Sequence, residues 1–512
     1  MCGICGELRF DGASPDMRAV ERMSEQLARR GPDHADTFAD GPLAFGHRRL
    51  AIIDLSPSAD QPMVDTALQL ALVFNGTIYN YRELRTELVA MGYVFFSGGD
   101  SEVILKAYHA WGEECVQRFY GMFAFAIWDM RQAHDKQRAR LFLARDRFGI
   151  KPLYLAHDAQ RLRFASSLPA LLAGGGVDTR IDAVALHHHF TLHTVVPAPR
   201  TVLRGVRKLP PATTMTVSLD GQVTHKVYWT LDATRPAQPL TEAEWLDATA
   251  KVLVRALERH RLAADVPVGV LLSGGLDSSL LVGMLADHVA DLLTFSIGFE
   301  GIPGVSVGAE KADEFEFSDL IAERFKTRHQ KFLIPNSEVL ARLPQAVAAM
   351  TEPMMSHDVI AFYLLSERVS KEVKVVLAGQ GADEVFAGYF WYPLMDAETG
   401  PAVERFSRHY FDRDHAEYLE MITPAWHPPG AADVTRELVA RELAKPQADT
   451  FLDEVWRFDA NTLIVDDPVK RVDNMPMAWG LEVRVPFLDH ELVEMAARMP
   501  PELKLKEGGN FP

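Results

Sequence analysis

The sequence predicts two domains, an α+β domain of antiparallel layers packed face to face and an α/β domain with a doubly wound parallel sheet. The first prediction comes from short strand-like runs separated by turn signals in the first half of the chain. The second comes from residues 266–285, VPVGVLLSGGLDSSLLVGML, in which an almost wholly apolar strand is followed by a glycine turn and a helix. A length of 512 residues supports two domains, because it exceeds what one hydrophobic core usually serves.

The composition excludes several classes of protein. A formal net charge of -17 argues against a broad nucleic-acid surface, which needs clustered Lys and Arg. The sequence has neither a signal-peptide pattern nor an apolar run long enough to cross a bilayer. Three cysteines, Cys2, Cys5 and Cys115, are too few for a disulfide framework and suit a reducing compartment. We therefore expect a cytoplasmic protein that binds small molecules, with no nucleic acid and no membrane; a homodimer stays open.

The first predicted element is a strand that begins at Cys2. From Cys2 to Phe10 the sequence alternates with period two, which is typical of a half-buried strand with Cys2 on its inner face. Further strand-like runs, interrupted by helices such as 101–111, follow at residues 70–74, 122–128, 140–144 and 161–165. Antiparallel layers packed face to face are the expected result.

The position of Cys2 suggests an N-terminal nucleophile. If the initiator methionine is removed, Cys2 carries a free α-amino group with an ordinary pKa of about 7.7–8.0. That amine can accept the thiol proton, so the nucleophile needs no histidine beside it. The alternative is that Cys2 is a small apolar residue of the core.

Four motifs follow Cys2: RGPD (30–33), GHRRLAIIDLS (46–56), FNGTIYNYREL (74–84) and SGGDSE (97–102). With Cys2 they resemble the glutaminase domain of the N-terminal-nucleophile amidotransferases, a layered αββα fold. The resemblance implies that Cys2 attacks the side-chain amide of glutamine and that the Asn75 side chain and the Gly76 N–H stabilise the oxyanion. It also implies that Arg49 pairs with the glutamine carboxylate and Asp100 with its ammonium group.

Each of these residues also has an ordinary structural interpretation. We expect Asn75-Gly76 to form a turn after a strand, which would expose an amide and an N–H together. Asp100 could be only the N-cap of the helix that follows, and Arg49 only a solvated charge. The family usually has Asn-Gly-Glu at this place, whereas this chain has Thr77.

A domain boundary is predicted near residue 210. Four prolines interrupt regular structure before it: Pro197, Pro199, Pro210 and Pro211. Residues 1–210 would form the glutaminase domain and 211–512 the second domain. The first helix of the second domain is predicted from the capping box that begins at Thr241 and ends at Glu244.

The segment SGGLDSS (273–279) is the most specific signal in the second half. Its backbone N–H groups lie at a helix N-terminus, which favours a bound phosphate, and it lacks the lysine of the kinase-type loop. It resembles the pyrophosphate loop of the ATP pyrophosphatases, which split ATP between the α and β phosphates. The implied ATP-binding residues are Ser273, Gly274, Gly275, Asp277, Ser278 and Ser279, with Val270, Leu272, Ile297 and Gly298 beside the adenine. Core packing explains Val270, Leu272 and Ile297 equally well.

A magnesium site is predicted beside this loop. The strand-like segments 292–299 and 373–384 should end at the same edge of the sheet, where doubly wound folds bind ligands. This places Asp383 and Glu384 near Asp277. Carboxylates beside a polyphosphate suit Mg²⁺, which keeps phosphate and water oxygens as its other ligands.

The segments 379–389 (GQGADEVFAGY) and 470–494 extend the resemblance to nearly the whole chain. Together with the preceding motifs they resemble glutamine-hydrolysing asparagine synthetase, and within it the subgroup that amidates N-acetylglutaminylglutamine. The implied enzyme is a ligase that uses ATP to adenylate a carboxylate and then amidates it with ammonia from glutamine. The alternative function is a glutaminase or regulatory protein with an impaired ATP half. The family continues past the end of this sequence, so the second domain is expected to be truncated.

The acceptor carboxylate stays open between aspartate and N-acetylglutaminylglutamine. Gln380 and Gly381 are the predicted acceptor-binding residues, and much-studied relatives have a glutamate in place of Gln380. The bordering stretches 352–363 and 380–392 contain no Arg or Lys, which an aspartate pocket needs. They offer aromatic and amide groups that suit a longer acceptor: Tyr363, Gln380, Tyr389, Trp391 and Tyr392. A basic residue could still come from elsewhere, for instance Lys470 or Arg471.

The run His187-His188-His189 is expected to be a polar or partly buried helix face. Three adjacent residues cannot all face one metal ion, and no second histidine cluster with ligand spacing is evident.

Overall fold

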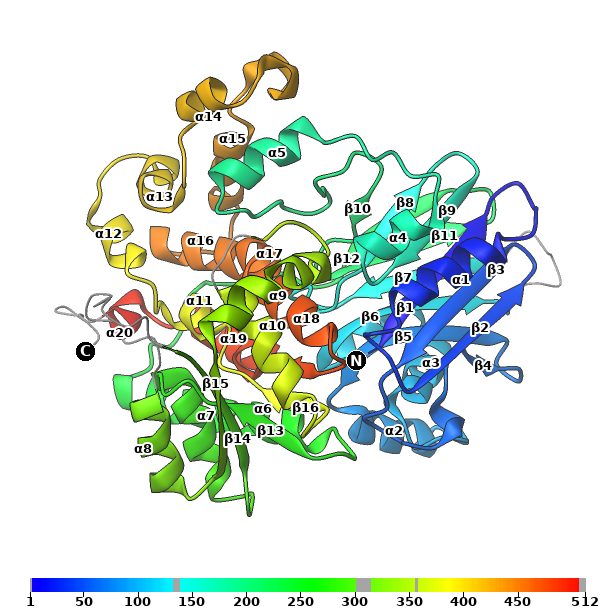
Figure 1. Cartoon of the computed structure of the whole chain (residues 1–512), viewed down its shortest axis with the longest axis horizontal. Helices are drawn as coiled ribbons and strands as arrows, with labels where there is room; N and C mark the ends of the chain where they lie inside the picture. The colour runs from blue at the N-terminus through cyan, green and yellow to red at the C-terminus, as the bar shows by residue number, and fades with distance from the viewer. Residues whose placement is uncertain (1, 132–138, 301–314, 355–357, 506–512) are drawn as a thin grey trace.

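The computed structural model describes residues 2–131, 139–300, 315–354 and 358–505 (Figure 1). Three residues of the predicted acceptor stretch 352–363 and the last seven residues of the chain lie outside the described residues. In the described part, no helix combines the length and the apolar character that a membrane crossing requires.

The first domain is built on two six-stranded antiparallel sheets that pack face to face. The first sheet has the order β10-β8-β9-β1-β3-β2, and the second has the order β12-β11-β7-β6-β5-β4. The strands of the first are β1 (Gly3–Arg9), β2 (His34–Asp40), β3 (Leu43–Arg49), β8 (Tyr154–His157), β9 (Arg161–Ala165) and β10 (Arg207–Lys208). Those of the second are β4 (Met63–Asp65), β5 (Leu70–Ile78), β6 (Gly121–Asp129), β7 (Arg140–Arg145), β11 (Thr213–Ser218) and β12 (Val223–Val227).

One core lies between the two sheets and helices cover their outer faces. Ile4 and Phe45 of the first sheet meet Val73 and Trp128 of the second, all fully or almost fully buried. On the outer face of the first sheet pack α1 (Met17–Gln26) and α4 (Leu168–Gly174), and on that of the second α2 (Tyr81–Ala90) and α3 (Asp100–Trp111). This is the αββα layering that the resemblance implied.

The boundary predicted at residue 210 does not mark the end of the first domain's sheet. Strand β11 follows Pro211, pairs with β7 through Thr214 and Ala144, and is continued by β12. Met215 and Val217 belong to the core between the two sheets. Pro210 and Pro211 lie in the loop that leads into β11. The second sheet of the first domain therefore ends at Val227, after this loop.

The second domain contains the doubly wound parallel sheet. Its strands have the order β15-β14-β13-β16-β17, and all neighbours are parallel. They are β13 (Val268–Leu271), β14 (Leu293–Phe299), β15 (Arg328–Ile334), β16 (Val375–Leu377) and β17 (Glu482–Arg484). Because β14 and β15 extend from β13 in one direction and β16 and β17 in the other, the topological switch point lies between β13 and β16.

Helices pack on both faces of this sheet. One group shares a core with Val270 and Leu377: α6 (Glu242–Leu262), α7 (Leu276–Ala286), α8 (Phe315–Phe325) and α19 (His490–Ala497). Another core contains residues of β15 together with α9 (Asn336–Ala349), α10 (Asp358–Val369) and α18 (Pro468–Met477). Helix α6 begins with the predicted capping box of Thr241 and Glu244, which the structure confirms.

The remaining helices form a group beside the sheet (Figure 1). They are α11 (Ala382–Phe386), α12 (Trp391–Ala397), α13 (Ala402–Tyr410), α14 (His415–Met421), α15 (Val434–Leu443), α16 (Phe451–Phe458), α17 (Ile464–Asp466) and α20 (Pro501–Lys504). Helix α5 (Ala183–Thr191), from the first half of the sequence, lies against α14 and α15.

Candidate functional sites

A small cavity in the first domain contains Cys2. The cavity measures about 30 Å³, and four of its lining residues were predicted from the sequence, namely Cys2, Arg49, Gly76 and Asp100. The backbone nitrogen of Cys2 donates to Asn75 Oδ1 at 3.0 Å, so the fifth predicted residue touches the same place. Burial raises the pKa of the Cys2 thiol, and the nearby Arg49 guanidinium opposes that rise.

Asn75 and Gly76 lie inside strand β5, so the prediction of a turn is wrong. Asn75 pairs with Ala124 and Gly76 with Phe123 across the sheet, because pairing with β6 overrides the local turn preference. Gly76 has a φ of +153°, and a Cβ there would lie 2.1 Å from the carbonyl oxygen of Met122. The Asn75 Nδ2 is buried with no hydrogen-bond partner in the described part of the chain. An unsatisfied buried donor therefore lies next to the N–H of a residue that has to be glycine, because a side chain would clash there.

Arg49 and Asp100 hold opposite charges at this cavity. The Arg49 guanidinium donates to Asp60 Oδ1 at 2.6 Å and to the carbonyl of Ser56 at 3.0 Å. Asp100 Oδ2 accepts the N–H of Ile78 at 3.0 Å, and burial raises the pKa of Asp100 to about 6. Asp100 is the first residue of α3 and Gly99 is its N-cap, so Asp100 does not serve as the cap.

A carboxylate from the second domain also lines this cavity. Glu482 of β17 accepts a hydrogen bond from Thr77 Oγ1 at 3.2 Å and pairs with Arg484 Nε at 2.6 Å. Burial alone would raise the pKa of Glu482, but Arg484 and Lys151 help to hold it at about 2. Glu482 was not predicted as a residue of this cavity, because it lies far from Cys2 in the sequence. The one available signal was Thr77, which lacks the carboxylate that the family usually has at that position.

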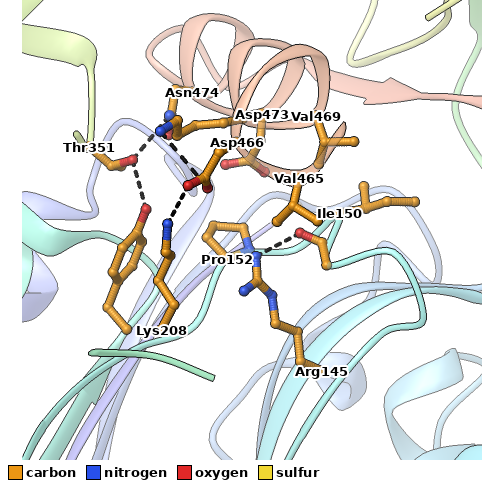
Figure 2. A pocket seen from close by; sticks show the side chains of 13 residues that line it. Arg145, Ile150, Pro152, Lys208, Thr351, Val465, Asp466, Val469, Asp473 and Asn474 are labelled. Carbon is orange, nitrogen blue, oxygen red and sulfur yellow. Dashed lines mark hydrogen bonds and ion pairs between the residues drawn. The ribbon is translucent and has the colours of Figure 1, made fainter. Parts of the chain in front are cut away.

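Charged pairs join the two domains next to this cavity. Arg30 Nε donates to the carbonyl oxygen of Cys2 at 3.3 Å, and its two terminal nitrogens donate to Asp473 of α18 at 2.8 and 3.1 Å. Lys208 forms an ion pair with Asp466. A small pocket of about 10 Å³ lies at this junction. Figure 2 shows side chains of both domains projecting into it. Helix α18 is therefore tied directly to the backbone that carries Cys2.

Three neutral side chains bridge the same junction. Tyr154 of β8 lies 3.1 Å from Thr351, measured between the hydroxyl oxygens, and Asn474 Nδ2 donates to Thr351 Oγ1 at 3.0 Å (Figure 2). Together with the ion pairs they are polar contacts between the domains, beside apolar residues such as Val465 and Val469.

A much larger cavity, about 1080 Å³, opens at the switch point of the parallel sheet. Ten residues predicted for ATP, metal or acceptor binding line it: Leu272, Ser273, Gly275, Asp277, Ser278, Ile297, Gln380, Gly381, Asp383 and Glu384. Four predicted residues do not: Val270, Gly274, Ser279 and Gly298. Val270 is fully buried in the core, and Gly274 packs so closely on α8 that a Cβ would lie 2.6 Å from Phe317 Cβ.

Two of the three predicted metal ligands, Asp277 and Asp383, line this cavity close enough for the charge of one to act on the other. Burial and then the neighbouring Asp383 raise the pKa of Asp277 to about 6, and burial raises that of Asp383. Glu384 is 3% exposed and accepts the Tyr389 hydroxyl at 2.7 Å. Within the described residues the three carboxylates do not form a three-ligand cluster. Two adjacent carboxylates still fit Mg²⁺, which takes most of its ligands from phosphate and water.

The candidate acceptor side of this cavity holds Gln380 and Arg471. Gln380 Oε1 is buried with no hydrogen-bond partner in the described part of the chain. Arg471 of α18 lines the cavity, and its guanidinium lies 3.3 Å from Asp358 and 3.7 Å from Asp467. A basic residue therefore does come from elsewhere in the sequence. Lys470, the other candidate, faces the junction between the domains instead.

Only part of the predicted aromatic surround reaches the cavity. Tyr389 lines it, and Trp391 stacks on Tyr389 with ring centroids 4.2 Å apart. Tyr363 is 1% exposed and Tyr392 fully buried; both pack in cores, and neither lines the cavity. The aromatic residues at these two positions are needed for packing, a role that the sequence pattern alone does not separate from binding.

Comparison with known proteins extends over both domains. The family model described as a glutamine amidotransferase domain matches residues 1–229, and the one described as asparagine synthase matches residues 248–510. Glutamine-hydrolysing asparagine synthetase 3 of Bacillus subtilis is 30% identical over 524 residues, covering 99% of this chain and 82% of the relative. Asparagine synthetase 1 of the same organism is 32% identical over 543 residues, covering 99% and 82%. Asparagine synthetase B of Escherichia coli is 27% identical over 538 residues, covering 100% and 77%.

Proposed function

The chain belongs to the glutamine-hydrolysing asparagine synthetase family, and from this premise we propose that its two cavities carry out the two halves of one amidation. The observation that carries the proposal is that α18 reaches both. Its Asp473 holds Arg30 beside Cys2, and its Arg471 lines the cavity at the switch point. Ammonia released at Cys2 would thus be used at the far side of the same helix.

At the first cavity we infer hydrolysis of glutamine. The α-amine of a processed Cys2 takes the thiol proton, and the sulfur adds to the side-chain carbonyl carbon of glutamine. Asn75 Nδ2, which has no hydrogen-bond partner among the described residues, and the N–H of Gly76 would stabilise the negative oxygen. The α-ammonium of Cys2 then returns the proton to the departing nitrogen, ammonia leaves, and water hydrolyses the thioester to glutamate and the free thiol. Arg49 would pair with the α-carboxylate and Asp100 with the α-ammonium group of the substrate.

At the second cavity we infer binding of ATP and activation of a carboxylate. The N-terminus of α7, with Ser273, Gly275 and Ser278, suits the pyrophosphate group. Asp277 and Asp383 would hold Mg²⁺, whose charge offsets that of the phosphates when it is bound. The acceptor carboxylate attacks the α-phosphorus, pyrophosphate leaves, and ammonia displaces AMP from the acyl-adenylate.

Two substitutions should separate glutamine hydrolysis from the ATP-dependent reaction. Cys2→Ala should abolish glutamine hydrolysis and leave synthesis from added ammonium, since only the nucleophile is lost. Asp383→Asn should stop the formation of AMP and pyrophosphate while glutamine is still hydrolysed. Release of ADP in place of AMP would contradict the adenylation proposal, and loss of both activities in a folded Cys2→Ala variant would contradict independent sites.

For the acceptor we propose aspartate first, because Arg471 offers a cation for its second carboxylate. N-acetylglutaminylglutamine is the second candidate, because Gln380 Oε1, which has no partner in the described part of the chain, suits an amide donor. The test is AMP release with ATP, Mg²⁺, glutamine and each acceptor in turn. Arg471→Gln should raise the KM for aspartate at least tenfold, whereas a dipeptide acceptor has no second carboxylate and should be little affected. AMP release with the dipeptide alone would contradict the aspartate proposal.

A further inference from the structure

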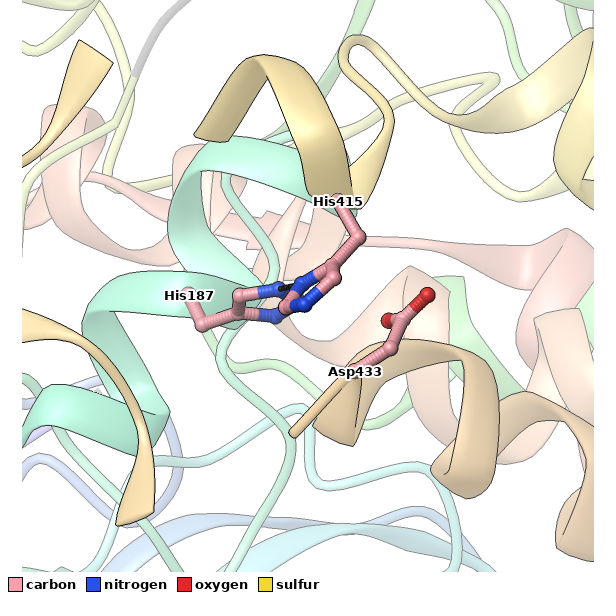
Figure 3. Close-up of side chains that lie close together, drawn as sticks. All are labelled: His187, His415 and Asp433. Atoms are coloured by element: carbon pink, nitrogen blue, oxygen red, sulfur yellow. Dashed lines mark hydrogen bonds between the residues drawn. The ribbon is translucent and has the colours of Figure 1, made fainter. Parts of the chain in front are cut away.

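We propose that His187, His415 and Asp433 bind one divalent transition-metal ion, with Zn²⁺ the best fit. These residues come from three separate elements: His187 from α5, His415 from the first position of α14, and Asp433 from the N-cap of α15. One ligand atom from each lies within 4.8 Å of the others, and this is the one such group of three found among the described residues. Figure 3 shows the two imidazole rings lying against each other, with Asp433 at the start of its helix.

The protons around His187 can be assigned from its hydrogen-bond partners. Thr191 Oγ1 donates its proton to the carbonyl of His187 at 2.8 Å, since a carbonyl can only accept. Thr435 must therefore donate the proton in its own 2.7 Å contact with Thr191. Thr435 Oγ1 then has only lone pairs left for His187 Nδ1 at 2.8 Å and His188 Nδ1 at 2.9 Å. Both histidines must carry their proton on Nδ1.

The same reasoning fixes the proton on His415. Its Nε2 lies 3.0 Å from the carbonyl oxygen of Ala431, so Nε2 carries the hydrogen and Nδ1 has a lone pair. His187 Nε2 also has a lone pair, and these two nitrogens face each other at 3.0 Å. Two facing lone pairs repel unless a positive ion or an additional proton lies between them. The observed hydrogen bonds therefore leave room for one cation at this contact.

A metal ion fits this contact better than a proton. An extra proton would be shared by the two nitrogens alone, whereas a metal ion uses all three ligand atoms, which lie within 4.8 Å of one another. Two nitrogens bound to one tetrahedral Zn²⁺ at about 2.0–2.1 Å lie about 3.3 Å apart, close to the 3.0 Å found here. Asp433 supplies a negative charge, and a fourth position stays open for water.

The outer hydrogen bonds have the pattern of a metal site. Each proposed ligand histidine donates its other N–H to a fixed oxygen, Thr435 Oγ1 for His187 and the Ala431 carbonyl for His415. Only the first histidine of the run 187–189 is a ligand, so the objection that three neighbours cannot face one ion does not apply. The ion would join α5 to α14 and α15, and its ligands line neither catalytic cavity, so the role we infer for it is structural.

The test is the metal content of the full-length protein. After treatment with a chelator and dialysis, the protein is titrated with Zn²⁺ or Co²⁺ at pH 7.5, and bound metal is measured by elemental analysis. We expect one Zn²⁺ per chain and, with Co²⁺, the visible absorption of a tetrahedral site. His415→Gln should reduce the Zn²⁺ affinity at least tenfold. Asp433→Asn, which keeps the helix cap, should reduce it by a smaller factor.

His193→Gln is the matched control. His193 pairs with Asp412 at 3.0 Å on the surface of the same region but lies outside the cluster. This variant should bind Zn²⁺ like the parent protein. Equal loss in His193→Gln and His415→Gln, or binding of less than one equivalent by the parent, would overturn the proposal. So would full retention of Zn²⁺ in a correctly folded His415→Gln, judged by its circular dichroism and unchanged glutamine hydrolysis.

Discussion

Burial changes the pKa values of individual side chains in the Cys2 cavity. Asp100 is almost fully buried, and burial raises its pKa to about 6, within the range in which the enzyme can be assayed. Cys2, Arg49 and Asp100 could be found from the sequence, because each belongs to a short motif in a fixed order. Their positions follow from local elements: the start of β1, the end of β3 and the first turn of α3.

We predict that glutamine binding weakens in acid because of Asp100. Only the ionised carboxylate can pair with the α-ammonium group, so the KM for glutamine should rise as the pH falls through about 6, approaching tenfold per pH unit. The measurement is the pH dependence of glutamine hydrolysis between pH 5 and 8. Asp100→Asn should lack this acidic limb and have a KM roughly 30-fold higher at pH 7.5, the equivalent of about 2 kcal/mol. An unchanged acidic limb in this variant would assign the titration to another group.

Whole elements show where local sequence signals fail. Asn75-Gly76 is a strong turn signal, yet β5 continues through both residues because β6 supplies hydrogen bonds along its whole length. The histidine run was correctly expected on a helix, but nothing near it in the sequence indicates that His415 and Asp433 lie beside it. The parallel sheet was predictable, because its apolar strands and glycine turns are local features.

Arg484, the last residue of β17, ties this strand to the end of α6. Its side chain is fully buried, binds Glu482 at 2.6 Å and donates to the carbonyls of His260 and Ala263 at the end of α6. Arg484→Met should leave the Glu482 carboxylate without this cation and destabilise the protein by about 3–5 kcal/mol. The measurement is the midpoint of denaturant unfolding.

The matched control for that prediction is Arg180→Met. Arg180 pairs with Asp178 on the surface, where water screens both charges, so its removal should leave the midpoint unchanged within error. Equal midpoints for the two variants would show that the buried pair contributes no more than the exposed one.

The packing of the two domains against each other is the feature that is least predictable from the sequence. Glu482 lines the Cys2 cavity although it belongs to the second domain, and Arg30 and Asp473 meet across 443 positions of sequence. Such contacts depend on how two folded units pack, and neither residue pattern nor local period encodes that. Strands β11 and β12 follow the boundary predicted at residue 210 for a similar reason, since β11 joins the first domain's sheet through its pairing with β7, and β12 through its pairing with β11.

We predict that Asp473 couples the two reactions. It holds the guanidinium of Arg30 through two hydrogen bonds, and Arg30 in turn holds the carbonyl of Cys2, while the same helix presents Arg471 to the large cavity. Asp473→Asn removes the negative charge but keeps the size of the side chain, so it should hold Arg30 less firmly. We then expect ammonia to escape to solvent at the junction between the domains. The ratio of glutamate formed to AMP formed should rise clearly above unity, while synthesis from added ammonium stays close to that of the parent.

Asp182→Asn is the control, because Asp182 pairs with Arg200 within the first half of the chain, and its ratio should not change. A ratio near unity in Asp473→Asn would show that this contact holds the domains together without guiding ammonia between them.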